Sequence, residues 1–154
     1  MNIVLLQPEI PQNTGNIARL CAATNSKLHL IEPFGFILDD RHLRRAGLDY
    51  WSLVEVQTYL DFEEFSLVNQ EGRFFYLTTK GQQFYYEVNF LPNDYLIFGP
   101  ETRGLPPEIL SLNPSHNLRI PMRPEARSLN LANSVAIVLY EALRQIKPLW
   151  HKPI

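Results

Sequence analysis

Short apolar runs alternate along this chain with segments of helical periodicity, and no other feature of the sequence restricts the fold as strongly. The first run, residues 2–6 (NIVLL), lacks polar–apolar alternation and is therefore typical of a strand buried on both faces. Because strands and helices alternate throughout, the sequence predicts an α/β fold whose parallel sheet is covered by helices on both faces. The expected strands are 2–6, 27–31, 53–56, 73–78, 95–99 and 117–121, and the expected helices are 16–25, 38–46, 61–68, 106–112 and 129–146.

The chain is expected to form a single domain over residues 1–154. Its 154 residues, 45% hydrophobic and 19% charged, have an ordinary globular composition with room for one substantial core. No apolar run reaches the roughly 18 residues of a membrane span, and the N-terminus lacks the pattern of a signal peptide. Cys21 is the only cysteine, which excludes an internal disulfide. These features favour a cytoplasmic protein with no membrane partner.

The net charge of −2 argues by itself against a nucleic-acid partner, but the charges are segregated along the chain. Acidic residues concentrate in 61–71, whereas many arginines lie in 41–45 and 119–127. Clustering of one sign suits a phosphate backbone, although solvated helix faces often have the same pattern. Charge therefore leaves RNA binding open.

The expected helix at 129–146 is apolar around most of its circumference. A helix of this kind needs cover on most sides, and at the end of a small domain a second subunit can supply it. A partner subunit is therefore a candidate for that cover. The apolar stripe is Leu131, Val135, Val138 and Leu139, with further apolar surface from Ala132, Ala136, Ile137 and Ala142.

A polar loop follows the first expected strand, at the edge where open parallel sheets bind their ligands. Asn13 or Thr14 is placed to cap the helix, and Gly15 permits a tight backbone. Arg19 would lie about one turn into that helix, with its guanidinium toward the loop. Capping plus one surface arginine is the simpler account of this loop taken alone.

A second polar loop, residues 98–106, follows the strand expected at 95–99. Gly99 lets a ligand approach the backbone closely, Glu101 can accept hydrogen bonds, and Arg103 can bind a carboxylate or phosphate. A strand-to-helix turn with an ion pair inside the loop explains these residues about equally well. Neither a G-x-G-x-x-G fingerprint nor a P-loop is present, so a glycine-rich phosphate loop does not hold the ligand.

A third polar loop, within residues 118–134, precedes the last expected helix. Ser128 and Asn130 fit an N-cap and a first turn. Together with several arginines at a helix N-terminus they also form an anion-receptive pocket. Three such loops in one short chain favour a ligand site.

Three segments of the chain resemble, in order and in spacing, the three motifs of the SPOUT RNA methyltransferases. They are similar more narrowly to the tRNA 2′-O-methyltransferases that act on a wobble cytidine or modified uridine. The resemblance covers about residues 2–146 and includes LHLIEPFGF, RRAGLDYW and YLTTKG between the motifs. The motif segments are QPEIPQNTGNIARLCA, YLIFGPETRGLP and LRIPMRPEARSLNLANSVAIVLYEALRQ.

The resemblance implies a deep trefoil knot in the C-terminal part of the domain, a homodimer, and S-adenosylmethionine bound against the knot loops. It implies methyl transfer to the 2′-hydroxyl of a tRNA ribose, which identifies the partner as RNA and not DNA. Main-chain groups would recognise the adenine. The residues implied to lie against or near the methyl donor are Leu77, Thr78, Gly99, Glu101, Ile120, Met122, Ser128 and Leu129.

By the same resemblance, Arg19, Ser128, Asn130 and Tyr140 matter most for the reaction, with Tyr140 serving the site of the partner subunit. A guanidinium has a pKa above about 12 and is effectively never deprotonated, so Arg19 is a poor general base. Our hypothesis is that Arg19 holds a phosphate or steadies the developing alkoxide. The candidates for contacts with the tRNA backbone are Arg41, Arg44, Arg45, Arg103, Arg123 and Arg127.

Three other functions remain open at this point. The first is a SPOUT enzyme that methylates another tRNA or ribosomal RNA ribose, and the second is a non-catalytic RNA- or nucleotide-binding domain. The third is a flavodoxin-like binding module, against which the absence of a phosphate loop counts modestly. No cluster of His, Cys and carboxylate residues has metal-ligand spacing, so we expect no metal.

Overall fold

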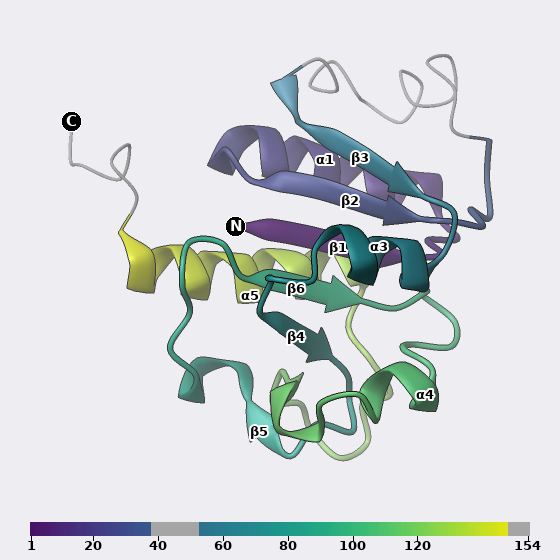
Figure 1. The fold of residues 1–154 in the computed structure, drawn as a ribbon. Coiled ribbons are helices and arrows are strands. Elements are labelled where there is room, and N and C mark those ends of the chain that lie inside the picture. Colours follow the sequence, from purple (N-terminus) through teal and green to yellow (C-terminus); the bar gives the residue numbers. More distant parts are fainter. Residues whose placement is uncertain (38–52, 148–154) are drawn as a thin grey trace.

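A computed structural model describes residues 1–37 and 53–147, which form one seven-stranded sheet (Figure 1). The strands run in the order β3-β2-β1-β6-β4-β7-β5, and all of the recorded strand pairs are parallel. The predicted parallel sheet is therefore confirmed. The strands are β1 (Asn2–Leu6), β2 (Lys27–Ile31), β3 (Val56–Tyr59), β4 (Phe74–Leu77), β5 (Gln83–Phe84), β6 (Tyr95–Phe98) and β7 (Asn117–Arg119).

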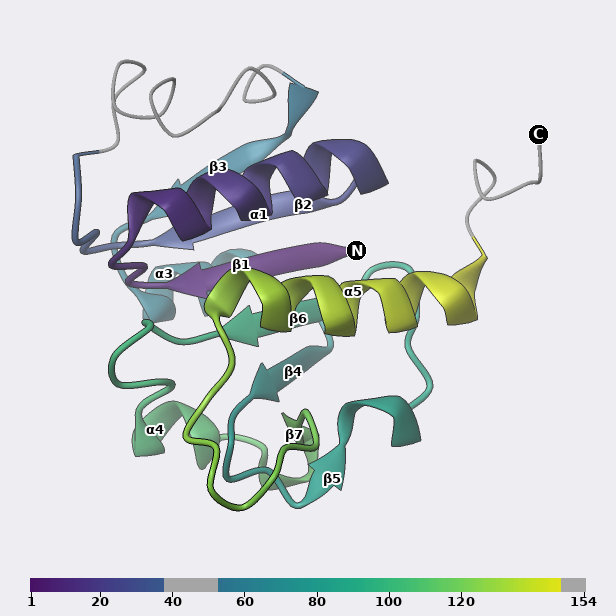
Figure 2. The same cartoon turned by 180° about the vertical axis from the view of Figure 1, so that it is seen from behind.

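Helices cover both faces of the sheet, as the sequence predicts. One face carries α1 (Pro11–Thr24) and α5 (Leu131–Ile146), which lie side by side in Figure 2, and the other face carries α3 (Phe62–Val68) and α4 (Pro107–Leu110). Two short 3-10 helices, η2 (Tyr85–Glu87) and η3 (Pro114–His116), complete the described part. The helix expected at 38–46 lies outside the described residues.

The continuous apolar runs explain why the sheet is buried on both sides. In β1, Ile3 and Leu5 belong to the core beneath α1 and α5, whereas Val4 and Leu6 belong to the core beneath α3 and α4. Each fully buried aliphatic side chain contributes roughly 1.5–3 kcal/mol. Alternate residues of one strand thus stabilise two separate helical layers.

The first helix begins earlier than the sequence pattern indicated. We expected it from residue 16 with Asn13 or Thr14 as the cap, but α1 begins at Pro11 with Ile10 at the N-cap, and both expected caps are buried inside the helix. The expectation was wrong because it followed the apolar spacing. Proline is favoured at the first helical position, where its missing N–H costs nothing, so the Ile10-Pro11 pair was the better signal.

Strand boundaries at one edge of the sheet also differ from expectation. The strand expected at 53–56 forms at Val56–Tyr59, because its ends are set by pairing with β2, in which Leu28 opposes Val56. β5 was not expected, since two residues paired with β7 produce no readable pattern. The remaining strands agree within two residues, and Asp61 caps α3 through its side chain on the Glu64 N–H.

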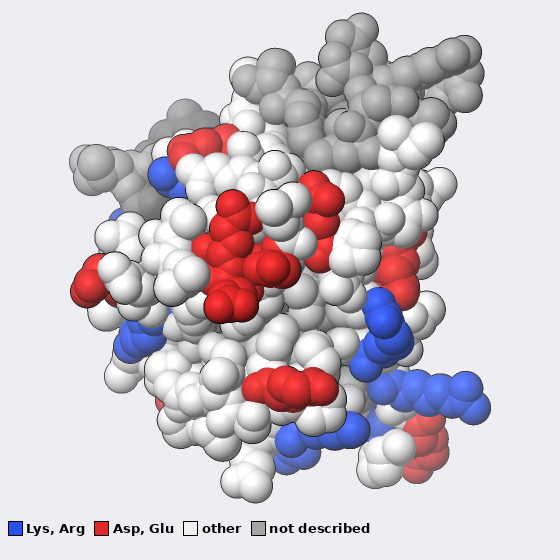
Figure 3. Space-filling view, turned by 45° about the vertical axis from the view of Figure 1, so that its right-hand side comes forward, with Lys and Arg blue, Asp and Glu red and all other residues white. Residues whose placement is uncertain are grey.

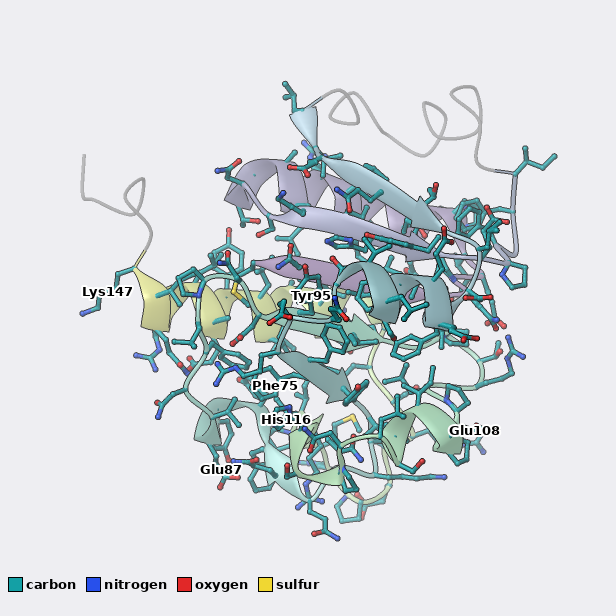
Figure 4. All side chains as sticks on the ribbon, in the orientation of Figure 1. Phe75, Glu87, Tyr95, Glu108, His116 and Lys147 are labelled. Carbon is teal, nitrogen blue, oxygen red and sulfur yellow. The ribbon has the colours of Figure 1, made fainter. Side chains whose placement is uncertain are left out.

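A buried polar network lies between the sheet and α3. His29 is 2% exposed; its Nδ1 is 2.9 Å from the Tyr59 hydroxyl and its Nε2 is 3.3 Å from the Asn2 side-chain oxygen. The neighbouring Tyr95, labelled in Figure 4, donates its hydroxyl to Asn69 Oδ1 at 2.8 Å. Burial lowers the pKa of His29 to about 4.

This histidine is expected to make the protein acid-sensitive. In the unfolded chain His29 takes up a proton below about pH 6.5, whereas in the folded chain it stays neutral down to about pH 4. The unfolded state therefore binds more protons in that window, and His29 should lower the free energy of unfolding by about 3 kcal/mol as pH falls through it. Urea unfolding at several pH values would measure this loss. His29→Gln should remove that component, and identical pH slopes in both proteins would contradict the assignment.

Candidate functional site

A cavity of about 1150 Å³ opens at the carboxyl ends of β1, β4 and β6. Its walls come from the ends of these strands, the loop between β6 and α4, the segment that follows β7, and the start of α5. This is the edge at which open parallel sheets bind ligands. The cavity exceeds the usual 300–1,000 Å³ or so of a small-molecule site, so it has room for more than one ligand.

The structure brings together every residue that the resemblance places near the methyl donor. They come from the ends of β4 and β6 and from the connection between β7 and α5, which approach one another because these parallel strands end at the same edge of the sheet. Leu105, Asn117 and Leu131 also line the cavity and were not predicted as residues of a ligand site. The eight expected residues, all in the cavity wall, are Leu77, Thr78, Gly99, Glu101, Ile120, Met122, Ser128 and Leu129.

The loop after β6 folds tightly back on itself. A Cβ atom on Gly99 would lie 2.3 Å from the carbonyl carbon of Gly104 and 2.3 Å from the nitrogen of Leu105. Gly104 adopts a left-handed conformation (φ 68°), and its N–H donates to the Pro100 carbonyl at 2.9 Å. Only glycine at position 99 allows this closure.

Glu101 ties this loop to the segment that leads into α1. Its carboxylate accepts hydrogen bonds from the Glu9 N–H at 2.8 Å, the Ile10 N–H at 3.2 Å and the Asn13 side-chain amide at 3.0 Å. The sequence predicted Glu101 as an acceptor for a ligand. In this structure its oxygens are engaged by the chain's own N–H groups, so it holds two cavity walls together.

Asn13 extends the same connection to the third wall. Its side-chain oxygen accepts from the Asn130 amide at 2.9 Å, while Asn130 Oδ1 accepts from the Asn133 N–H at 3.2 Å and caps α5. The chain Glu101–Asn13–Asn130 therefore joins all three motif loops. Sequence reasoning treated Asn13 as a helix cap or as a donor and acceptor of the first loop, and its 5% exposure is a property that only the fold reveals.

A second set of contacts joins the same loops nearer the surface. The Glu9 carboxylate accepts from the Thr102 N–H at 3.0 Å and from the Thr102 hydroxyl at 2.8 Å. Arg103 lies 3.8 Å from the Glu9 carboxylate and donates to Gln7 Oε1 at 3.2 Å. The sequence suggested an ion pair within the loop of residues 98–106. The structure instead pairs Arg103 of this loop with Glu9 of the first loop. Because the Arg103 side chain is 65% exposed, its ion pair with Glu9 is weak, and Arg103 can exchange Glu9 for another anion.

The predicted catalytic residues divide into two groups. Ser128 and Asn130 line the cavity. Arg19 and Tyr140 do not: both are exposed, on α1 and on α5. The expected place of Arg19, one turn into its helix, was wrong because α1 begins at Pro11, which puts Arg19 about two turns in.

The predicted RNA-binding arginines also have different locations. Arg103 and Arg127 line the large cavity, and Arg123 lines a smaller cavity beside it. Arg41, Arg44 and Arg45 lie outside the described residues. On the face in Figure 3, acidic side chains gather near the middle, and basic ones lie toward the lower right, the bottom and the left, with acidic side chains beside them at the right.

Residues 1–37 and 53–147 are the part of the chain that the structure describes. No group of three or more His, Cys, Asp or Glu residues in these ranges is arranged to hold a metal ion. No helix in the same ranges is long and apolar enough to cross a membrane.

Comparison with known proteins agrees with this geometry. A tRNA (cytidine(34)-2′-O)-methyltransferase of Saccharophagus degradans is 54% identical over 146 residues, covering 94% of this chain and 95% of the relative. The enzyme of the same name from Escherichia coli K12 is 53% identical over 147 residues and covers 95% and 94%. A solved structure described as "Structural insights into the 2-OH methylation of C/U34 on tRNA" superposes with a TM-score of 0.88 at 48% identity, covering 94% of each chain. The model of the SpoU rRNA methylase family matches residues 1–140, and the chain therefore belongs to this family.

Proposed function

We propose that the chain transfers the methyl group of S-adenosylmethionine to the ribose 2′-hydroxyl of nucleotide 34 of tRNA, a wobble cytidine or modified uridine. The observation that carries the proposal is the convergence of the three motif loops on one cavity, joined by Glu101, Asn13 and Asn130. The two relatives described above bear the name of this activity at more than 50% identity over nearly the whole chain.

The cavity wall suits S-adenosylmethionine. Leu77, Ile120 and Leu129 offer apolar surface to an adenine ring, and the main chain around them can hydrogen-bond its edge. Asn117 adds a side-chain oxygen that has no hydrogen-bond partner among the described residues. The volume beyond that of one small ligand leaves room for the nucleotide to be methylated.

The reaction forms an O–CH₃ bond at the ribose, breaks the S–CH₃ bond and releases the hydroxyl proton. In-line approach of the two reacting atoms is the main requirement, so positioning supplies much of the rate. Ser128 and Asn130, at the start of α5, are assigned to hold the ribose. Arg19 holds a phosphate or steadies the developing alkoxide, because a guanidinium does not accept the proton.

Replacement of Arg19 tests this role. Arg19→Lys keeps the positive charge and should retain measurable methyl transfer, about tenfold below the unchanged protein, because bidentate contacts are lost. Arg19→Ala should lose considerably more. Methyl-transfer kinetics of both variants would check these expectations, with their affinity for S-adenosylmethionine measured in parallel. Complete loss in Arg19→Lys with intact cofactor binding would contradict the charge-based role.

We further propose that the protein is a homodimer through the outer surface of α1 and α5. Ile137 and Tyr140 are 37% and 54% exposed on this surface, and apolar groups of this size favour a covered position. A second copy there would give Arg19 and Tyr140, which lie away from the cavity of their own subunit, a place beside the cavity of the partner. Analytical ultracentrifugation would test whether the protein is a dimer in solution.

We also propose a cytoplasmic location, because the proposed substrate is tRNA.

A C-terminal trefoil knot is also part of the proposal. β7 lies between β4 and β5 in the sheet, and the loop joining those two strands crosses close to β7, since a Cβ on Gly81 would be 2.7 Å from the Asn117 carbonyl oxygen. The segment from β7 to α5 must then pass this loop. Threading of this kind is rare, and family membership is what favours it.

The decisive experiment uses radiolabelled S-adenosylmethionine and tRNA that lacks its native methylation, followed by mapping of the labelled nucleotide. We expect the label on the ribose of nucleotide 34. Label on another tRNA or ribosomal RNA ribose would favour a different target for the same chemistry. Cofactor binding without transfer to any RNA would favour a non-catalytic domain, and no cofactor binding would overturn the proposal.

A further inference from the structure

A smaller cavity of about 360 Å³ lies beside the large one. It is formed by Thr79 in the loop after β4, by Phe84 of β5, and by β7 with the segment that follows it. Four residues, Thr79, Ile120, Met122 and Arg127, line both cavities. A group bound in the smaller cavity would therefore lie next to the methyl-transfer site.

The smaller cavity is strongly basic. Arg119, Arg123 and Arg127 line it, and no carboxylate does. Within the described ranges, neither Arg123 nor Arg127 forms an ion pair. On the β5 side, Glu87, labelled in Figure 4, uses its carboxylate to accept from the Phe84 N–H at 2.8 Å. Glu125 belongs to the basic segment but does not line the cavity.

Arg119 is held in position by an aromatic ring. Its guanidinium carbon lies 4.5 Å from the ring centroid of Phe84, and its Nε is buried with no hydrogen-bond partner. A buried donor left unsatisfied is costly, and a ligand that accepts from it recovers that cost. The stacked guanidinium is preorganised for an anion, which lowers the entropy lost on binding.

The aromatic surface continues outward from the cavity. Phe84 stacks on Tyr86 with centroids 5.4 Å apart and planes at 15°, and Tyr86 is 48% exposed. Exposed aromatic rings next to basic side chains are typical of sites for single-stranded nucleic acid, where each base stacks on a ring irrespective of its identity. An inorganic anion would have no use for this surface.

We infer that the smaller cavity binds a phosphodiester group of the tRNA strand next to the target nucleotide, with the adjoining base stacked on the Phe84–Tyr86 pair. Three guanidinium groups line this cavity, and arginine binds phosphate oxygens bidentately. This inference rests on the proposed function, and it adds Arg119, Phe84 and Tyr86 to the residues expected to bind RNA.

The inference is tested by steady-state kinetics of the full-length protein with a tRNA anticodon stem-loop, using Arg123→Gln, Arg119→Gln and Phe84→Leu. Each arginine variant should raise the KM for RNA about tenfold. Each should also reduce the slope of log affinity against log salt by about one phosphate contact. Phe84→Leu should raise the KM and leave the salt slope unchanged, because it removes stacking but no charge. In all three, kcat and the Kd for S-adenosylmethionine should stay within about twofold of the unchanged protein.

Lys27→Gln provides the matched control. It removes one positive charge from the opposite, amino-terminal edge of the sheet, where Lys27 is half exposed and pairs with Glu55. Its KM for RNA should stay unchanged. Because Arg123 is exposed, Arg123→Gln remains informative even if Arg119→Gln does not fold. A weaker Kd for S-adenosylmethionine with an unchanged KM for RNA would overturn the inference and identify the arginines as ligands of the cofactor carboxylate. Equal effects in Lys27→Gln would also overturn it, whereas absence of methyl transfer in the unchanged protein would refute the proposed function instead.

Discussion

Gly99→Ala is expected to reduce kcat/KM for methyl transfer by at least about 100-fold. The added Cβ would lie 2.3 Å from two backbone atoms of the same loop. Carbon atoms pack at about 3.5–4.0 Å, so the loop would have to move by more than about 1 Å. A displacement of this size at a site that works by positioning costs about two orders of magnitude. Isothermal titration with S-adenosylmethionine and a methyl-transfer assay would measure the effect on protein shown to be folded by circular dichroism.

Gly104→Ala is the companion variant in the same turn. A Cβ there meets nothing within 4 Å, but the residue has φ 68°, which costs an L-amino acid roughly 1–2 kcal/mol. Its effect should be a modest loss of stability, with less than tenfold loss of activity. If the two variants behave alike, backbone conformation and not the close approach at Gly99 controls the loop.

Glu101→Gln is expected to cause the second large loss, again about 100-fold in kcat/KM. The carboxylate accepts three N–H groups, and an amide in its place turns one oxygen into a donor that faces another donor. Each charge-assisted hydrogen bond lost costs roughly 1.5–3 kcal/mol. The wall formed by residues 99–104 would then separate from the start of α1 and disturb the cavity, which assays at saturating cofactor would detect.

A double-mutant cycle with Asn13→Ala distinguishes a joint from two independent contacts. If Glu101, Asn13 and Asn130 act as one unit, the two losses in stability should overlap, with a coupling energy of about 0.5–3 kcal/mol. Glu63→Gln, in the exposed first turn of α3, is a charge-matched control that should change neither stability nor kcat/KM for methyl transfer. Strict additivity of Glu101→Gln and Asn13→Ala would argue against the joint.

The core of the fold could be predicted because burial on both faces leaves a direct trace in the sequence. The runs NIVLL and KLHLI became central strands with almost no change in their limits. Strands whose limits depend on pairing with a neighbouring strand were harder to predict. The edge strand β3 takes its limits from β2, and the two-residue β5 exists only because β7 lies beside it.

The candidate site shows the same division. The eight residues expected near the methyl donor all line one cavity, because a motif resemblance carries spatial information that spacing alone does not. The contacts that join the loops were missed: Glu101 meets Asn13 across 88 positions, and Asn13 meets Asn130 across 117. Local sequence patterns indicate contacts between residues a few positions apart. They could not predict that the Asn13 side chain contacts residues so distant in the sequence.

The pairing of β1 with β6 also affects how the protein folds during its synthesis on the ribosome. Asn2 lies in register with Tyr95, its N–H donates to the Asp94 carbonyl at 3.0 Å, and α5 must still follow to cover that seam. At roughly 5–20 residues per second, the first strand waits on the order of 5–20 s for its second neighbour. During this interval one edge of β1, a strand with four apolar residues, is unpaired in the nascent chain, which is a target for chaperones and a risk for aggregation. The cavity cannot close before residues 128–131 have left the exit tunnel, so translation itself keeps the unfinished chain from binding its ligand.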